Sequence, residues 1–182
     1  MRSVLIMLAV LPGSVAADPR PHVDLELGVA LGPLDRDTAP VTYEQTGFGA
    51  ALAVAGGVGL ELDEHHAVLV RGRLAKAHAF SHLAIGLELI HRFDARLSAS
   101  VGLGGARVGG VGGHDDPLVD HPVGRGPAVW VGGSYRLWGP IAASASVTTG
   151  IAYLEPDYFA ERDWHADTVF VLALSADFST LW

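Results

Sequence analysis

The sequence contains no cysteine among its 182 residues, so no disulfide can stabilise it. It is also poor in charge: Asp, Glu, Lys and Arg make up 18% of the chain, against roughly 25% in ordinary soluble proteins. After residue 17 no apolar stretch reaches the length of about 20 residues that a transmembrane helix needs. The chain, 49% hydrophobic, must therefore be stabilised by a sizeable core or by lipid.

The first residues have the pattern of a secretory signal peptide. Arg2 supplies a basic start, an apolar stretch runs from Val4 to Leu11, and small residues lead up to Ala17. We expect cleavage after Ala17, so that residues 1–17 are the signal peptide and 18–182 form one domain; a buried N-terminal helix is the alternative. Removing Arg2 from the 12 basic residues leaves 11 against 20 acidic ones, and this net charge of −9 argues against nucleic acid as a partner.

Apolar residues alternate with small or polar residues along most of the chain, whereas helical periodicity is hard to find. In the first run Val23, Leu25 and Leu27 share one face, and Asp24 and Glu26 share the other. There are eight such runs of about 9 to 16 residues, a length that crosses a membrane at a tilt. They begin near residues 23, 48, 67, 82, 96, 128, 141 and 168.

The connections between the runs alternate in length. Long segments follow the first, third, fifth and seventh runs, whereas the tight turns "DEHH", "HRFDA" and "WGP" follow the second, fourth and sixth. Long loops at one end and tight turns at the other are typical of outer-membrane barrels, whose tight turns face the periplasm. The sequence therefore predicts an all-β fold, an eight-stranded antiparallel up-and-down transmembrane β-barrel.

A soluble barrel with its polar face in water is the alternative, and the distribution of charge argues against it. The small or polar faces of the runs carry only nine charges, too few for a water-exposed surface. In the lumen of an eight-stranded barrel, which side chains fill, five acids and four bases can pair. All nine fall in the periplasmic half and predict a charge ring that plugs the lumen, with a gated or proton-conducting constriction as the alternative: Asp24, Glu26, Glu61, Arg71, Arg73, Glu88, Arg96, Arg136 and Asp177.

The aromatic residues fall into two groups on this topology. Seven lie near the end with the long loops, and five near the tight turns: Phe93, Tyr135, Trp138, Phe178 and Trp182. Trp130 and Phe170 alone fall within the runs. Two aromatic belts that flank an aliphatic band are expected where amphipathic rings sit at the level of the lipid headgroups.

The last run, "DTVFVLALSADFSTLW", alternates and ends on an aromatic residue. With the strand number, the loop asymmetry and the signal peptide, it makes the chain resemble the small eight-stranded outer-membrane barrels of Gram-negative bacteria, of the OmpA transmembrane domain and OmpX kind. The resemblance implies location in the cell outer membrane, contact with outer-membrane lipids and lipopolysaccharide, and recognition of the last strand by the barrel-assembly machinery. It assigns the assembly signal and lipid interface to Phe170, Leu172, Leu174, Phe178 and Trp182. In that family the last residue is usually Phe, and a Gly often found earlier in the signal is missing here.

One loop contains residue types that bind divalent metals. The stretch "HDDPLVDH" supplies the candidate ligands His114, Asp116, Asp120 and His121, although its glycine-rich flanks are equally typical of a solvated loop. We expect no cofactor. No His-x-Ser triplet of the lipid A deacylase kind occurs, and an adjacent Asp and His are thin support for an omptin-like protease, so we do not expect an enzyme.

The four long loops are acidic. Counted over 35–44, 76–81, 107–125 and 154–167, they hold eleven acids and five bases, which suits an extracellular partner or divalent cations bridged to lipopolysaccharide. The sequence therefore favours an integral outer-membrane barrel with a structural or surface-interaction role. A narrow channel for ions or small solutes is the alternative, and an outer-membrane enzyme acting on lipid or peptide comes third.

Overall fold

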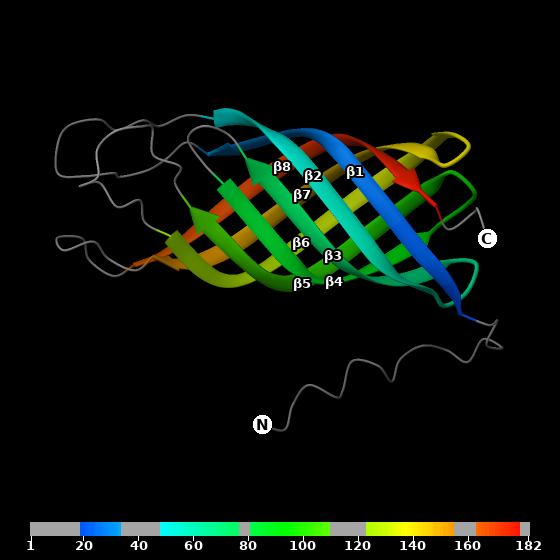
Figure 1. The fold of residues 1–182 in the computed structure, drawn as a ribbon, viewed down its shortest axis with the longest axis horizontal. Helices are drawn as coiled ribbons and strands as arrows, with labels where there is room; N and C mark the ends of the chain where they lie inside the picture. Colours follow the sequence, from blue (N-terminus) through cyan, green and yellow to red (C-terminus); the bar gives the residue numbers. More distant parts are fainter. Residues whose placement is uncertain (1–18, 34–47, 77–80, 110–122, 155–162, 179–182) are drawn as a thin grey trace, which may run out of the picture.

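The computed structural model describes residues 19–33, 48–76, 81–109, 123–154 and 163–178, which form eight β-strands (Figure 1). The strands are β1 (Arg20–Pro33), β2 (Phe48–Glu61), β3 (His66–Lys76), β4 (Ser81–Arg92), β5 (Leu97–Gly109), β6 (Val123–Trp138), β7 (Ile141–Leu154) and β8 (Asp163–Asp177). They are 11 to 16 residues long and coincide with the eight alternating runs. The expected all-β fold is confirmed.

The strands close into a single barrel. Each pairs antiparallel with its neighbours in the sequence, and β8 pairs with β1 to complete the ring. In this closing pair Leu31 lies opposite Phe170 and Asp24 opposite Asp177. Closure leaves no free sheet edge, so the backbone hydrogen bonds of every strand are made within the barrel.

No helix among the described residues is long and apolar enough to cross a membrane.

The tight turns lie at one end of the barrel, together with the start of β1 and the end of β8 (Figure 1). They span 62–65, 93–96 and 139–140. In the last of them Gly139 has a φ of 51°, a left-handed conformation that glycine adopts without strain. The pairing of β6 with β7 shifts register just before it, between Arg136 and Trp138.

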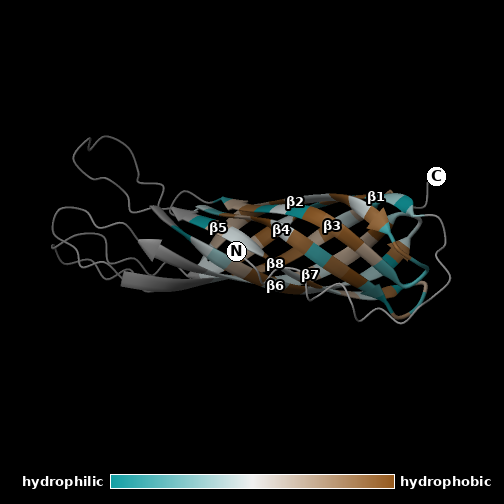
Figure 2. Cartoon of the chain, turned by 90° about the horizontal axis from the view of Figure 1, so that it is seen from below, coloured by the Kyte–Doolittle hydropathy of each residue, from teal (hydrophilic) through white to brown (hydrophobic). Residues whose placement is uncertain are grey.

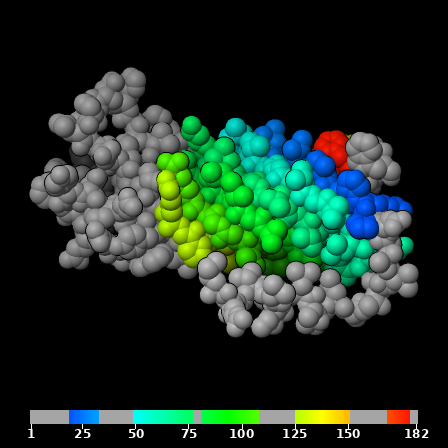
Figure 3. All heavy atoms as spheres, turned by 60° about the horizontal axis from the view of Figure 1, so that its bottom comes forward, coloured from blue at the N-terminus to red at the C-terminus, as the bar shows by residue number. Residues whose placement is uncertain are grey.

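Large apolar side chains cover the outer wall. Leu27, Leu87 and Leu172 are 60%, 55% and 66% exposed, and β1 to β6 and β8 all contribute similar residues. Figure 2 shows hydrophobic residues recurring along the strands, and Figure 3 shows side chains of neighbouring strands forming one wall. So large an apolar surface is stable only against lipid or another apolar partner, and it matches the outward band of membrane barrels.

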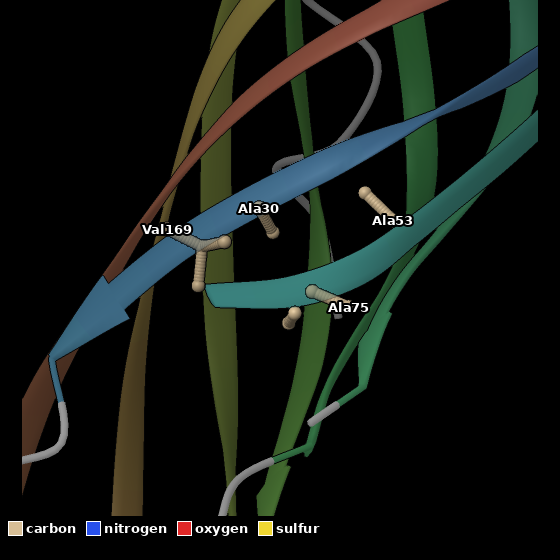
Figure 4. Close-up of a cluster of buried hydrophobic side chains, with 5 residues drawn as sticks. Ala30, Ala53, Ala75 and Val169 are labelled. Carbon is tan, nitrogen blue, oxygen red and sulfur yellow. The ribbon is translucent and has the colours of Figure 1, made fainter. Parts of the chain in front are cut away.

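Small residues line the half of the lumen that lies toward the long loops. Ala30, Ala53, Ala75 and Val169 point into it from β1, β2, β3 and β8 (Figure 4), and Ala51 completes this buried cluster. Their size follows from the narrow interior of an eight-stranded barrel. The larger polar side chains lie below them, toward the tight turns.

Candidate functional site

Five charged side chains are buried in the lumen, in the half nearer the tight turns. Asp24 and Glu26 come from β1, Arg71 and Arg73 from β3, and Glu88 from β4, and none is more than 8% exposed. Strand alternation turns every second residue inward, which places 24 with 26 and 71 with 73. Charges at this depth are stable only when they are paired.

Arg71 lies at the centre of this cluster. Its Nη2 pairs with Oδ2 of Asp24, its Nη1 donates to Oε2 of Glu26 at 3.1 Å, and its Nε lies 3.2 Å from Oε2 of Glu88. Arg73 adds a second positive charge, with Nη2 3.0 Å from the same oxygen of Glu88. The two guanidinium groups thus draw carboxylates from β1 and β4 together across the lumen.

Trp130 of β6 fills the space beside these charges. Its Nε1 donates to Oε2 of Glu88 at 2.5 Å, and its side chain is 1% exposed. The guanidinium carbon of Arg73 lies 5.7 Å from the ring centroid, a cation–π distance. Nη1 of Arg73 also donates to Oγ of Ser146 on β7 at 2.8 Å, so the cluster reaches across to the opposite wall.

A second layer of charges lies below, at the mouth with the tight turns. Nη2 of Arg92 lies 2.6 Å from Oε1 of Glu61 and 3.7 Å from Oδ2 of Asp177. Nη2 of Arg136 approaches the same oxygen of Asp177 at 3.6 Å. This layer is less buried than the upper one, since the side chain of Arg136 is 33% exposed.

His22 connects the two layers. Its Nδ1 lies 3.4 Å from Oε1 of Glu61 and 3.8 Å from Oδ1 of Asp177, whereas its Nε2 is 4.0 Å from Oδ2 of Asp24. The imidazole is 2% exposed and lies two residues before Asp24 on the same face of β1. Together the two layers hold five carboxylates and four guanidinium groups.

Eight of the nine sequence-predicted charges thus meet in the lumen, and Arg96 does not. It lies exposed in the 93–96 turn, where its Nη1 donates to the hydroxyl of Tyr135 at 3.2 Å. That hydrogen bond raises the pKa of Arg96. The expectation for Arg96 is wrong because β5 begins one residue later, at Leu97.

Three lumen residues were missed in the sequence. Arg92 was assigned to the turn "HRFDA", but β4 continues to it and keeps its side chain on the face of Glu88. His22 precedes the first alternating run, and parity with Asp24 was the signal that could have identified it. Trp130 falls within a run, but its hydrogen bond to Glu88 joins residues 42 apart in the sequence, which the alternation of one strand does not indicate.

A small cavity lies on the loop side of the upper cluster. Glu26, Arg73, His82 and Thr148 line it together with apolar residues. His82 lies in β4 and is 3% exposed. The cavity admits the centre of a water molecule over about 20 Å³, room for about one or two waters.

Two other predicted sites are only partly visible. The four candidate metal ligands His114, Asp116, Asp120 and His121 lie outside the described residues. Of the predicted assembly and interface residues, Phe170, Leu172 and Leu174 are exposed on the outer wall, Phe178 is half-buried and Trp182 is outside the described residues. The backbone N–H of Phe178 donates to the carbonyl of Val23 at 2.9 Å and extends the β1–β8 seam.

The fold has counterparts among solved structures. Ail, the attachment invasion locus protein of Yersinia pestis, in complex with the heparin analogue sucrose octasulfate, is 10% identical over 87% of this chain and 99% of its own, with a TM-score of 0.57. The N-terminal β-barrel domain of Pseudomonas aeruginosa OprF is 12% identical over 88% of this chain and 99% of its own, with a TM-score of 0.51. The sequence itself matches no protein-family model and no curated protein. The chain therefore has the fold of the small eight-stranded outer-membrane barrels, as the sequence resemblance predicted.

Proposed function

We propose that this protein is an integral outer-membrane barrel that acts through its surface, as a structural or interaction protein, and that its lumen is closed. The observation that carries the proposal is the buried cluster around Arg71, which contacts three carboxylates drawn from two strands. Trp130 fills the space beside it. Side chains therefore occupy the cross-section through which a solute would have to pass.

The energetics of the cluster support a closed lumen. Taking charges out of water is costly, and pairing them offsets most of that cost. Removing one partner of a buried pair typically destabilises a protein by about 3–5 kcal/mol, because the other charge stays buried and unpaired. Glu88 meets Arg71, Arg73 and Trp130 at once, so opening this cross-section would break several interactions together.

Planar-bilayer recording tests whether the lumen is closed. We expect the folded wild-type barrel to carry no steady ion current. Glu88→Ala and Arg71→Ala should each produce current, because the remaining charges lose their partners and attract water. Glu64→Ala, in the exposed 62–65 turn, is the matched control and should stay silent. A steady wild-type current altered by Arg71→Ala would instead support a narrow channel for ions or small solutes.

The acidic loops support a surface role with a preference for positive charge. Eleven acids face five bases in the four loop segments. Ail was crystallised with a sulfated heparin analogue, and an acidic surface would repel such a ligand. For this chain we propose a cationic partner, or divalent cations that link loop carboxylates such as Asp116 and Asp120 to lipopolysaccharide phosphates.

Replacing residues 110–122 by a glycine–serine segment of equal length tests this role. The variant should fold, as judged by heat-modifiable migration in detergent gels, because the replaced residues lie between β5 and β6. It should bind less tightly to vesicles containing lipopolysaccharide and Mg²⁺. Unchanged binding with and without Mg²⁺ would contradict the cation-bridging proposal.

Assembly by the barrel-assembly machinery is part of the same proposal. The outward residues of β8 form an unbroken apolar row of Phe170, Leu172 and Leu174 at the closing seam. We propose no catalytic role and no cofactor.

A further inference from the structure

A histidine pair lies at the tight-turn end of the barrel, away from the lumen. His66 is the first residue of β3, and His91 lies directly opposite it in β4. Along these strands His66 has the parity of Val70, and His91 has the parity of Leu89, both exposed apolar residues. The pair therefore lies on the outer wall, at the periplasmic edge of the apolar band.

Two imidazole nitrogens of this pair face each other at short range. Nε2 of His66 lies 3.1 Å from Nδ1 of His91, and the ring centroids are 4.9 Å apart. The other ring nitrogen of His66, Nδ1, lies 2.9 Å from both carboxylate oxygens of Asp63. A carboxylate only accepts hydrogen bonds, so Nδ1 carries the proton and Nε2 of the neutral ring presents a lone pair toward His91.

The turn holds this arrangement in place. Oδ1 of Asp63 accepts the backbone N–H groups of His65 and His66 at 2.7 and 2.8 Å, which fixes the carboxylate that orients His66. On the other strand the ring of Phe93 packs edge-on against His91, with centroids 4.7 Å apart and planes at 87°. Both imidazoles are thus positioned by neighbours before any ligand binds.

We propose that Nε2 of His66 and Nδ1 of His91 bind a divalent transition-metal ion of the Zn²⁺ class. An ion about 2.05 Å from both nitrogens, at their 3.1 Å separation, gives an N–metal–N angle of about 98°, between the octahedral and tetrahedral values. Imidazole nitrogens suit Zn²⁺, Cu²⁺ and Ni²⁺. A carboxylate that accepts the other N–H of a ligating histidine is the usual second partner at such sites, and Asp63 has that position.

The site is open, with two protein ligands. Within the described part of the chain, no group of three or more His, Asp and Glu side chains is arranged to hold a metal ion, so water completes the coordination. In the metal-free protein the Nδ1–H of His91 donates to Nε2 of His66. Binding moves that proton through solvent from Nδ1 to Nε2 of His91, which frees the Nδ1 lone pair with no net proton release from the neutral ring.

Calorimetric titration of the untagged, detergent-folded mature protein with Zn²⁺ tests the proposal. The background is a His114→Ala/His121→Ala variant, so that the acidic loop cannot supply the signal. We expect saturable binding of one ion. His66→Ala or His91→Ala should weaken it by at least about tenfold, and Asp63→Asn by about 10–100-fold, the usual effect of losing a partner that orients a ligand.

Nitrogen-15 NMR of the histidine rings supplies a second measurement that separates ligation from a loss of folding. Zn²⁺ should shift Nε2 of His66 and Nδ1 of His91, whereas the buried ring of His82 serves as the control and should not respond. Heat-modifiable migration shows that each variant remains folded. No saturable Zn²⁺ binding, or equal affinity after His66→Ala and His91→Ala in folded protein, would overturn the proposal.

Discussion

At the scale of single residues, Trp130 and Gly102 depend on each other. They lie opposite one another in the β5–β6 pair, and a Cβ added at Gly102 would come within 2.1 Å of the indole. The absence of a side chain at 102 is therefore what lets the indole lie flat enough to reach Glu88. One glycine on β5 thus allows the hydrogen bond that Trp130 donates to Glu88 of β4.

Gly102→Ala should destabilise the barrel by about 1–3 kcal/mol, because the added methyl group overpacks the lumen. It should also move the indole and break its bond to Glu88. Denaturant unfolding of the lipid-embedded barrel and tryptophan fluorescence measure the two effects.

Gly105→Ala is the matched control on the same strand, since its added Cβ would meet only the carbonyl of Gly126, at 3.7 Å. It should change neither measurement appreciably. Equal effects of the two substitutions would show that an added methyl group destabilises β5 at either position, and that the contact with Trp130 is unimportant.

At the scale of elements, the turn between β4 and β5 is organised by one carboxylate. Oδ1 of Asp94 accepts the backbone N–H of Arg96 at 2.6 Å and that of Leu97 at 2.8 Å. These hydrogen bonds lower the pKa of Asp94, since they favour its charged form. They also fix where β5 starts.

The hydrogen bonds of Asp94 in this turn predict that the stability of the barrel depends on pH. A carboxyl group whose pKa is lowered by folding stabilises the folded state above its unfolded pKa, about 3.9 for Asp, and that contribution disappears as the pH falls through the lower folded value. Asp94→Asn should therefore lose stability at neutral pH and show a shallower loss than wild type below about pH 4. Unfolding midpoints measured from pH 2 to 7 test this, and parallel curves for the two proteins would contradict it.

The same turn explains which parts of the site the sequence could predict. The alternation of apolar and polar residues identified the inward face of every strand. Eight of the nine charges that it predicts for the lumen lie there. It could not locate strand ends, which depend on hydrogen bonds such as those of Asp94. For this reason Arg92 was placed in a turn and Arg96 in the lumen, the reverse of what the structure has.

At the scale of the whole molecule, the barrel is built inside out relative to a soluble protein. Most of its large apolar residues are outside, and its buried charges and its most buried aromatic ring are inside. The sequence predicted this inversion because the small and polar faces carried too little charge for water. It did not predict which charges pair, since partners such as Arg71 and Glu26 are 45 residues apart.

The lipid-facing band predicts that the cost of an outward-facing arginine depends on its depth in the bilayer. Leu172 lies near the middle of β8 and is 66% exposed, whereas Leu97 begins β5 beside a tight turn and is 45% exposed. Leu172→Arg should cost about 2–4 kcal/mol in a bilayer, and Leu97→Arg about 0–1 kcal/mol, because arginine near the interface reaches water. Folding equilibria in phospholipid vesicles measure both, and equal costs would argue that the band does not face lipid.

The lumen cluster has a consequence for the order of assembly. Arg73 reaches Ser146 of β7, Trp130 of β6 reaches Glu88 of β4, and Asp177 of β8 meets Arg92. The ion pairs of Arg71 and Arg73 join β1, β3 and β4 alone, so the early strands can pair most of their own charges, and the late strands add the neutral partners Trp130 and Ser146. Completing the ring therefore encloses charges that are already largely paired, and a barrel with a missing last strand would be open at the seam and would lack the carboxylate that Arg92 and Arg136 share.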